Sequence, residues 1–208
     1  MEEQVIQILN TLLNTETIRT KDIPNIELYM DQLTTFMEKG LGSTKRYPDD
    51  KIMTKTMVNN YTKNHLFPPS NKKKYSKEHI FLLIMIYYYK NVLSIADIQH
   101  LLSPLSERYF PKNKENGITL EHIFNTLIDQ IKNNKEGTEN EILHILDQSK
   151  SLFTDTEIKD EEQEELSRFV FITQLCYDIF LRKQLIERLL DDAYPPLEHT
   201  KKDKKNKK

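Results

Sequence analysis

The sequence predicts an all-α protein. Only 4 of the 208 residues are glycine and 30% are charged, and leucine, isoleucine, lysine and glutamate are abundant, a composition that favours helices. Apolar residues recur at intervals of three and four along nearly the whole chain, which is the helical period. The length allows one or two domains with a real core. A small β-hairpin is expected only in one basic turn at Lys72.

Two helices are predicted in the first part of the chain. The first carries an apolar stripe over residues 5–13. In the second, Pro24 suits the first helical turn, because the amide that proline lacks has no helical partner there. Apolar residues follow at helical spacing from Ile26 through Tyr29 as far as Met37, and Gly40 and Gly42 are expected to stop the helix.

A polar helix, a double proline and a buried helix then follow one another. Thr54 can cap a helix that runs to about Asn64, and Pro68-Pro69 prevents it from continuing. Ser76 can cap the next helix, whose run over residues 80–85 is apolar on every side and therefore belongs in the core.

Capping boxes and prolines mark the helices that come next. Ser94 and Asp97 resemble a capping box, and Ser103-Pro104 is expected to end that helix. A clean amphipathic helix follows over residues 120–131. Thr138 starts a second capping box.

The last part of the chain combines a long helix with a basic tail. The helix covers about residues 160–191, is broadly apolar between Leu166 and Leu181, and is closed by Pro195-Pro196. The lysine-rich tail lacks apolar residues and is therefore expected to be disordered. The predicted regions are an N-terminal helix at 1–20, a helix-turn-helix domain at 21–105, a connecting loop at 106–117, a helical region at 118–194 and the tail at 195–208.

Positive charge is concentrated in one segment, although the formal net charge is −2. Over residues 45–77 the lysines and arginine are opposed only by Asp49 and Asp50, whereas residues 136–165 are acidic. With no global basic field, any contact with nucleic acid must come from this local patch.

Other functional classes lack their motifs. The sequence has no glycine-rich phosphate loop, no nucleophile motif and no metal-ligand spacing among its six histidines, so neither an enzyme nor a cofactor or metal site is expected. Each histidine is expected at a surface or cap position. Cys176 is the only cysteine and is predicted to be an inert, buried thiol. The acidic N-terminus and the lack of a long apolar run predict a soluble, cytoplasmic protein.

The helix after Thr54 has the polar face of a DNA-reading element. Its polar side chains recur at i, i+3, i+4 and i+7 and so share one face, which can meet base edges and phosphates in the major groove. The lysines of the following turn can neutralise phosphates. The residues predicted to anchor this helix on the core are Met57, Val58 and Tyr61. The candidate DNA-contacting residues are Lys55, Thr56, Asn59, Asn60, Lys63, Lys72, Lys73, Lys74 and Tyr75.

Each feature also has a simpler interpretation. The three lysines can be a solvated turn without a partner, and Asn59 and Asn60 can be ordinary helix-surface polarity. The residues Tyr87-Tyr88-Tyr89 could stack on bases, but their place at the end of a core helix favours packing.

The order of these motifs resembles the MerR-type winged helix-turn-helix. The matching segments are 54–61, 66–69, 72–76 and 94–98. The span is more closely similar to the bacterial family called domain of unknown function 1836, which is classed near MerR, on residues 28–32, 55–61 and 73–76. The resemblance covers roughly residues 25–105 and implies a winged fold that binds DNA, but no reaction or ligand. Two features depart from the MerR pattern, since the connection over 40–53 is longer and the wing over 70–75 is short.

We therefore predict a DNA-binding transcriptional regulator that reads duplex DNA with a helix and a basic wing. The alternative is a winged-helix-like protein-interaction module without DNA-binding activity. Helix-turn-helix proteins usually act as two-fold dimers, and the long helix is apolar over more than one stripe. A homodimer through the C-terminal helices is thus expected, with Phe169, Val170 and Leu175 as contacts. The other outcome is that neighbouring helices cover both stripes within one chain.

Overall fold

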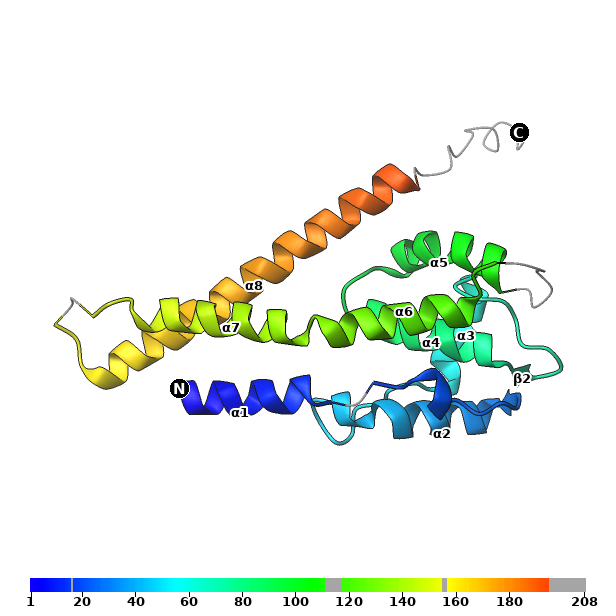
Figure 1. Ribbon diagram of the computed structural model, residues 1–208, viewed down its shortest axis with the longest axis horizontal. Helices are drawn as coiled ribbons and strands as arrows, with labels where there is room; N and C mark the ends of the chain where they lie inside the picture. Colours follow the sequence, from blue (N-terminus) through cyan, green and yellow to red (C-terminus); the bar gives the residue numbers. More distant parts are fainter. Residues whose placement is uncertain (16, 111–116, 155–156, 195–208) are drawn as a thin grey trace, which may run out of the picture.

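The computed structural model describes residues 1–15, 17–110, 117–154 and 157–194. It is mostly helical with one two-stranded sheet (Figure 1), which confirms the all-α prediction with its small β exception. The elements in chain order are α1 (Glu2–Leu13), η1 (Thr20–Asp22), β1 (Leu28–Tyr29), α2 (Met30–Leu41), η2 (Gly42–Thr44), α3 (Lys55–Lys63), β2 (Lys74–Tyr75), α4 (Lys77–Tyr89), α5 (Ile95–Tyr109), α6 (Leu120–Asn133), α7 (Lys135–Lys150) and α8 (Asp160–Ala193).

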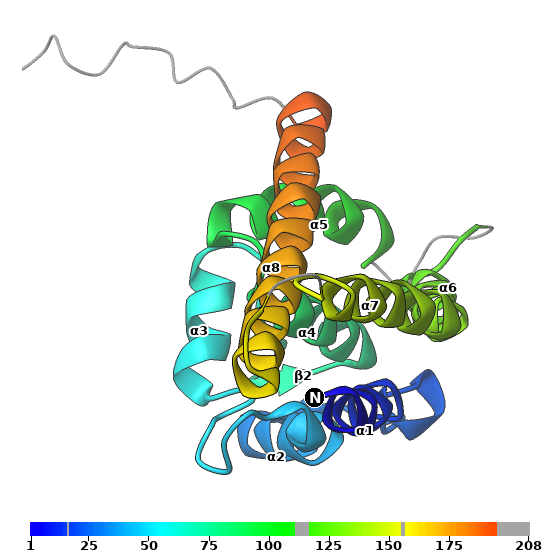
Figure 2. The same ribbon diagram turned by 90° about the vertical axis from the view of Figure 1, so that its left-hand side faces the viewer.

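The helices are arranged around α4. Helices α6 and α7 run end to end above α1 and α2, and α8 starts beside α7 and then diverges from it to pass α5 (Figures 1 and 2). Every residue from Ile80 to Ile86 is at most 4% exposed, so the prediction that this run lies in the core is confirmed. Tyr87 is also buried, and Tyr88 and Tyr89 pack against the core.

Three predicted helix starts are confirmed. The Thr54 hydroxyl accepts a hydrogen bond from the Met57 amide at 3.2 Å. Ser94 and Asp97 form the expected reciprocal capping box. Ser76 is the N-cap of α4.

The predicted helix start at Pro24 is wrong. The chain bends at Asn25 and Ile26 and then forms a strand at Leu28 and Tyr29, which pair antiparallel with Tyr75 and Lys74. Helix α2 begins only at Met30. A pairing between segments so far apart in the chain leaves no local signal.

The predicted helix end at Ser103-Pro104 is also wrong. Helix α5 continues to Tyr109 with Pro104 inside it, so residues 106–109, which were expected in the connecting loop, are helical. Pro104 is exposed, so the carbonyl that loses its helical partner can bond to water. Leu102, two residues before Pro104, is buried in the core, and this burial stabilises the helix.

Two predictions in the C-terminal half need correction. Thr138 is not an N-cap, since α7 starts at Lys135 and the Thr138 hydroxyl bonds back to the Asn134 carbonyl at 3.0 Å. Cys176 is exposed rather than buried, because α7 covers only one side of α8. The loop residues 111–116, Pro195-Pro196 and the rest of the predicted tail lie outside the described residues.

Two helical glycines differ in the space around them. A Cβ on Gly40 would lie 2.5 Å from Cδ1 of buried Ile18, whereas one on Gly137 would meet nothing within 4 Å. We therefore expect Gly137→Ala to raise the free energy of unfolding by about 0.5–1 kcal/mol through helix propensity. For Gly40→Ala the change in the free energy of unfolding should be lower than for Gly137→Ala by at least about 1 kcal/mol, because the new methyl group overpacks against Ile18. Urea unfolding of both variants measures the difference, and equal gains would contradict the close packing of Ile18 on α2.

Within the described ranges, no helix combines the length and hydrophobicity that a bilayer span requires.

Candidate nucleic-acid interface

Helix α3 presents a polar face to solvent. Val58 and Tyr61 are 0% and 6% exposed, and Met57 packs against the core, so the three predicted anchor residues are confirmed. With this side of the helix buried, the opposite side must face outward. The residues Thr56, Asn59, Asn60 and Lys63 are all exposed.

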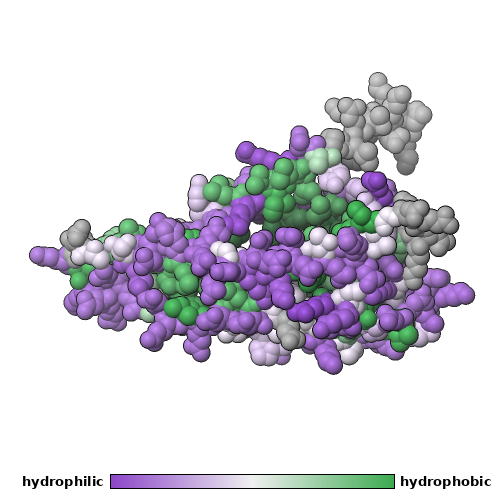
Figure 3. Space-filling model, viewed as in Figure 1, coloured by the Kyte–Doolittle hydropathy of each residue, from purple (hydrophilic) through white to green (hydrophobic). Residues whose placement is uncertain are grey.

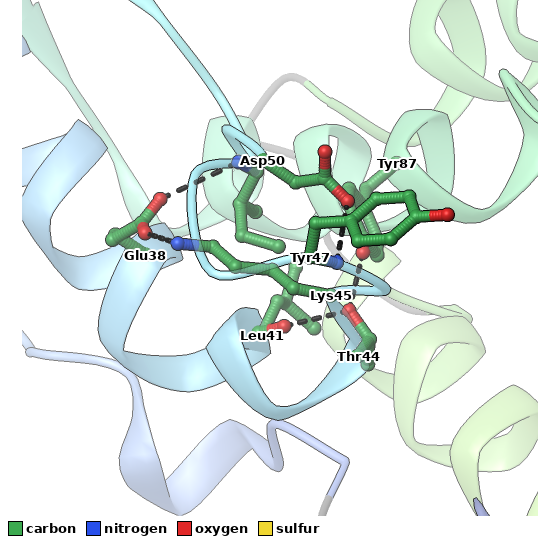
Figure 4. A network of polar contacts seen from close by, with 8 residues as sticks. Glu38, Leu41, Thr44, Lys45, Tyr47, Asp50 and Tyr87 are labelled. Atoms are coloured by element: carbon green, nitrogen blue, oxygen red, sulfur yellow. Dashed lines mark hydrogen bonds and ion pairs between the residues drawn. The ribbon is translucent and has the colours of Figure 1, made fainter.

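The long connection before α3 is fixed by polar contacts (Figure 4). The Glu38 carboxylate accepts the Ile52 amide at 3.4 Å and also pairs with Lys45. The hydrogen bond from Lys45 lowers the pKa of Glu38. The Ile52 carbonyl accepts from the Lys90 ammonium at 3.2 Å, and Thr44 bonds to the Leu41 carbonyl at 2.6 Å. Residue 52, just before α3, is therefore held from α2 and from the end of α4.

The lysine turn is a tight two-residue hairpin. Asn71 and Lys74 exchange two backbone hydrogen bonds, at 3.1 and 2.8 Å. Between them, Lys72 and Lys73 have φ angles of 47° and 65°. Two consecutive left-handed residues are the pattern of a type I′ turn, where asparagine and glycine are preferred. Lysine in this region costs about 1–2 kcal/mol per residue.

The strain at Lys72 and Lys73 has no local compensation. Both side chains are exposed, and among the described residues neither forms an ion pair, a side-chain hydrogen bond or a ring contact. Strained backbone of this kind is concentrated at functional sites. The turn thus holds two uncompensated cations in a conformation that lysine disfavours.

Contacts through β1 join the turn to α3. The Lys74 ammonium lies 5.3 Å from the centre of the Tyr29 ring, across the β1–β2 pair. Two residues further on, Asp31 pairs with Lys55 in the first turn of α3. The lysine turn and the start of α3 are therefore neighbours, linked by residues 29–31.

Not every predicted contact residue is equally available. Lys55 is paired with Asp31, and Lys74 is half-buried over Tyr29. Tyr75 is only 5% exposed and packs edge-on to His79 at 5.5 Å, because it alternates inward along β2. This buried position contradicts its prediction as a surface contact. The exposed candidates without a partner among the described residues are Thr56, Asn59, Asn60, Lys63, Lys72 and Lys73.

The sequence did not indicate two residues of this region. Tyr29 was expected on the apolar face of a helix, but it caps α2 from an edge strand and is 53% exposed. His79 was expected at a surface or cap position, and it completes the capping box of α4, since its Nδ1 accepts the Ser76 amide; its burial under the lysine turn, with 4% exposed, was not expected. Its position three residues after the Ser76 cap was the only local signal.

The arrangement offers cations, amides and hydroxyls on one side of the molecule. Among the described residues, no three His, Cys, Asp or Glu side chains gather in a way that could hold a metal ion. The acidic start of α8 lies at the end of the molecule opposite to β2 (Figure 1). The most acidic segment of α8 therefore lies far from the lysine turn.

A family model described as "Domain of unknown function (DUF1836)" matches residues 18–127, a little over half of the chain. No curated protein and no solved structure matches the chain.

Proposed function

The chain belongs to the DUF1836 family, and from the geometry of its basic face we propose that it binds duplex DNA as a transcriptional regulator. The observation that carries this proposal is the pair of uncompensated, left-handed lysines, Lys72 and Lys73, beside the exposed polar face of α3. Helix α3 enters the major groove and the lysine turn contacts the adjacent phosphates. An α-helix with its side chains is about 10–12 Å across, which fits the major groove with its width of about 12 Å.

In this proposal α2 and α3 form a helix-turn-helix, and the β1–β2 pair with the lysine turn is a minimal wing. The resemblance to MerR-type domains supports the order of these parts. The longer connection between α2 and α3 is compatible with it, since Glu38 and Lys90 hold the connection against the core.

A duplex of random sequence tests the proposal directly. Fluorescence anisotropy titrations between about 50 and 200 mM salt should detect binding, and the logarithm of the association constant should fall linearly with the logarithm of the salt concentration. If the basic face serves a partner protein instead, no duplex should bind even at the lowest salt.

Base reading is expected to depend on Asn60. Its side-chain amide can pair bidentately with adenine. Asn60→Ala should cost roughly 1–3 kcal/mol on the best site and little on random DNA, and helix propensity favours its folding. Lys63→Ala is the matched control, since loss of a phosphate contact should weaken both duplexes alike. Equal losses for Asn60→Ala on both duplexes would exclude base reading by this side chain.

We further propose that the protein acts as a homodimer through α8. Phe169, Ile172 and Ile179 are 67%, 53% and 62% exposed, and exposed Cys176 lies between them. These four positions alternate by three and four residues, as in the seam of a coiled coil. Further apolar side chains gather on the C-terminal half of α8 (Figure 3). Such a surface favours a partner helix.

The structure changes the set of residues proposed for the dimer contact, which the sequence placed at Phe169, Val170 and Leu175. Phe169 stays, but Val170 and Leu175 are half-buried, whereas Ile172 is exposed although it borders the same groove with α1 as Leu175. On that side, Gln174 accepts a hydrogen bond from Ser149 of α7 at 3.1 Å. The exposed seam therefore comprises Phe169, Ile172, Cys176 and Ile179, which we call the α8 seam.

Charge at the ends of the α8 seam supports a second copy as the partner. Glu165 precedes Phe169 by four residues, and Lys183 follows Ile179 by four. An antiparallel two-fold pairing that sets Phe169 against Ile179 therefore sets Glu165 against Lys183 at both ends. A parallel pairing would oppose like charges. Lys183 now pairs with Glu187 on the surface, an exposed contact that costs little to exchange.

A further inference from the structure

His79 joins the two ends of the lysine turn from beneath. Its Nδ1 accepts the Ser76 amide at 3.0 Å, and its Nε2 lies 3.4 Å from the Pro69 carbonyl oxygen. Pro69 and Ser76 flank the segment that contains Lys72 and Lys73. One buried side chain thus contacts the chain where it enters the turn and where it leaves it.

These two bonds require one form of the imidazole. Nδ1 accepts only without a proton, and Nε2 donates to a carbonyl only with one, so His79 must be neutral. Three rings surround it edge-on, those of Phe67, Tyr75 and Phe110, with centroid distances of 5.9, 5.5 and 4.7 Å. A charged imidazole in this enclosure would be poorly solvated.

The charged groups near His79 do not reverse this preference. Burial lowers the pKa of His79, and it outweighs the opposing effects of the Pro69 and Pro68 carbonyls and of the carboxylates Glu78 and Glu27. Glu78 lies on the same helix and Glu27 precedes β1. The strand β2 contributes Tyr75, and the α5 side contributes the apolar ring of Phe110.

We propose that His79 is the positioning residue of the lysine turn, and that its protonation releases the turn and weakens its contact with DNA. The second half of this inference rests on the proposed function. The Ser76 hydroxyl also lies 3.0 Å from Nδ1 and donates to the Glu78 carboxylate at 2.5 Å. A proton on Nδ1 makes it a donor to that hydroxyl and leaves the Ser76 amide without its acceptor, and the outward shape of Lys72 and Lys73 then loses its support.

The direction of the effect distinguishes this role from simple electrostatics. Added positive charge near DNA ordinarily strengthens phosphate binding at low pH. Here protonation should weaken it. Because the pKa of His79 is lowered on folding, the open turn takes up the proton first as the pH falls below about 6.5. The turn is therefore stable above that pH and loses stability as the pH falls toward the lowered pKa.

Hydrogen exchange of the Ser76 amide in the full chain tests the positioning role without DNA. Between pH 7.5 and 5, protection corrected for intrinsic exchange should fall by up to about tenfold per pH unit below 6.5, as one linked proton requires. His79→Gln should remove this dependence while keeping protection, because glutamine is the usual capping-box acceptor three residues after a serine cap. His79→Phe should leave the amide unprotected at every pH.

His100→Gln, at an exposed position of α5, is the matched control and should behave as the wild type. Protection of Ser76 that does not change with pH in the wild type would overturn the inference, as would a His79→Gln variant that still titrates.

The DNA arm separates the two proposals. At constant salt, lowering the pH from 7.5 to 5.5 should reduce the affinity of the wild type for random duplex more than it reduces the affinity of His79→Gln. Binding with the same pH dependence in both proteins would overturn the link from His79 to DNA. Exchange that titrates in a protein that binds no DNA would refute the proposed function and leave the positioning role of His79 intact.

Discussion

Replacing Lys72 and Lys73 with asparagine and glycine should make the protein more stable and a weaker DNA binder. Asparagine followed by glycine is the preferred sequence for a type I′ hairpin, so the turn keeps its shape and loses two cations. Relief of two left-handed lysines (φ 47° and 65°), at about 1–2 kcal/mol each and less about 0.5–1 kcal/mol for the greater unfolded-state freedom of glycine, should raise the free energy of unfolding by about 1–3 kcal/mol. Lys74 is left in place because it packs over Tyr29.

The same double variant should lose affinity for every duplex about equally. Each lost phosphate contact removes about 0.9 from the slope of log affinity against log salt, and on the order of tenfold in affinity at 0.1 M salt. The slope should therefore become shallower by about 1.8. Anisotropy titrations at several salt concentrations, with urea unfolding of the same samples, measure both effects.

A control with equal charge loss makes the result specific. Lys39→Asn with Lys132→Asn removes two lysines from α2 and α6 that lie outside the lysine turn, and its salt slope should match the wild type. If both double variants lose affinity alike, overall charge rather than the turn governs binding. If Lys72→Asn with Lys73→Gly becomes more stable and still binds normally, the turn lies outside the interface.

The second large effect is expected on assembly. The free protein should be a dimer at micromolar concentration, and Phe169→Glu should convert it to a monomer. Each dimer contains the α8 seam twice, so the change removes two buried phenylalanine side chains, worth about 3 kcal/mol or more. The monomer should also bind DNA weakly, because it reads one half-site instead of two. Phe169 is 67% exposed in the single chain, so the fold itself should tolerate the change. Sedimentation equilibrium measures the dimer constant.

A charge swap tests the antiparallel register. Glu165→Lys alone places a lysine opposite Lys183 of the second copy and should weaken the dimer. Adding Lys183→Glu restores opposite charges at both ends and should restore the dimer. Asp191→Lys changes an exposed carboxylate of the same helix whose counterpart in this register, position 157, lies before α8 begins, so it should have no effect. A wild-type protein that stays monomeric at high concentration, with and without DNA, would refute the dimer. A dimer that the double swap fails to restore would refute the antiparallel pairing.

Local chemistry determined much of the fold. The caps at Thr54, Ser76 and Ser94 and the apolar run over 80–86 lie where short-range patterns put them, because capping and full burial are each specified by a few neighbouring residues. The outward polar face of α3 follows from its periodicity for the same reason. These features could be predicted without any knowledge of the neighbouring elements.

The errors occur where a distant segment overrides a local preference. Pro24 and Pro104 carry strong local signals, but strand pairing with residues 74–75 keeps the end of the first region extended and burial of Leu102 keeps the second helical. The same cause explains exposed Cys176, since a helix apolar on several sides does not specify which side its neighbours cover.

The sequence by itself determined the composition of the candidate interface, which is three lysines in a turn beside a helix with a polar face. Only the tertiary structure decided how that interface is built. It places Tyr75 in the core, pairs Lys55 with Asp31, puts Lys72 and Lys73 into left-handed conformations and brings His79 under both ends of the turn. The physical reason is that backbone strain and burial depend on which segments meet, and segments far apart in the chain meet only in the folded molecule.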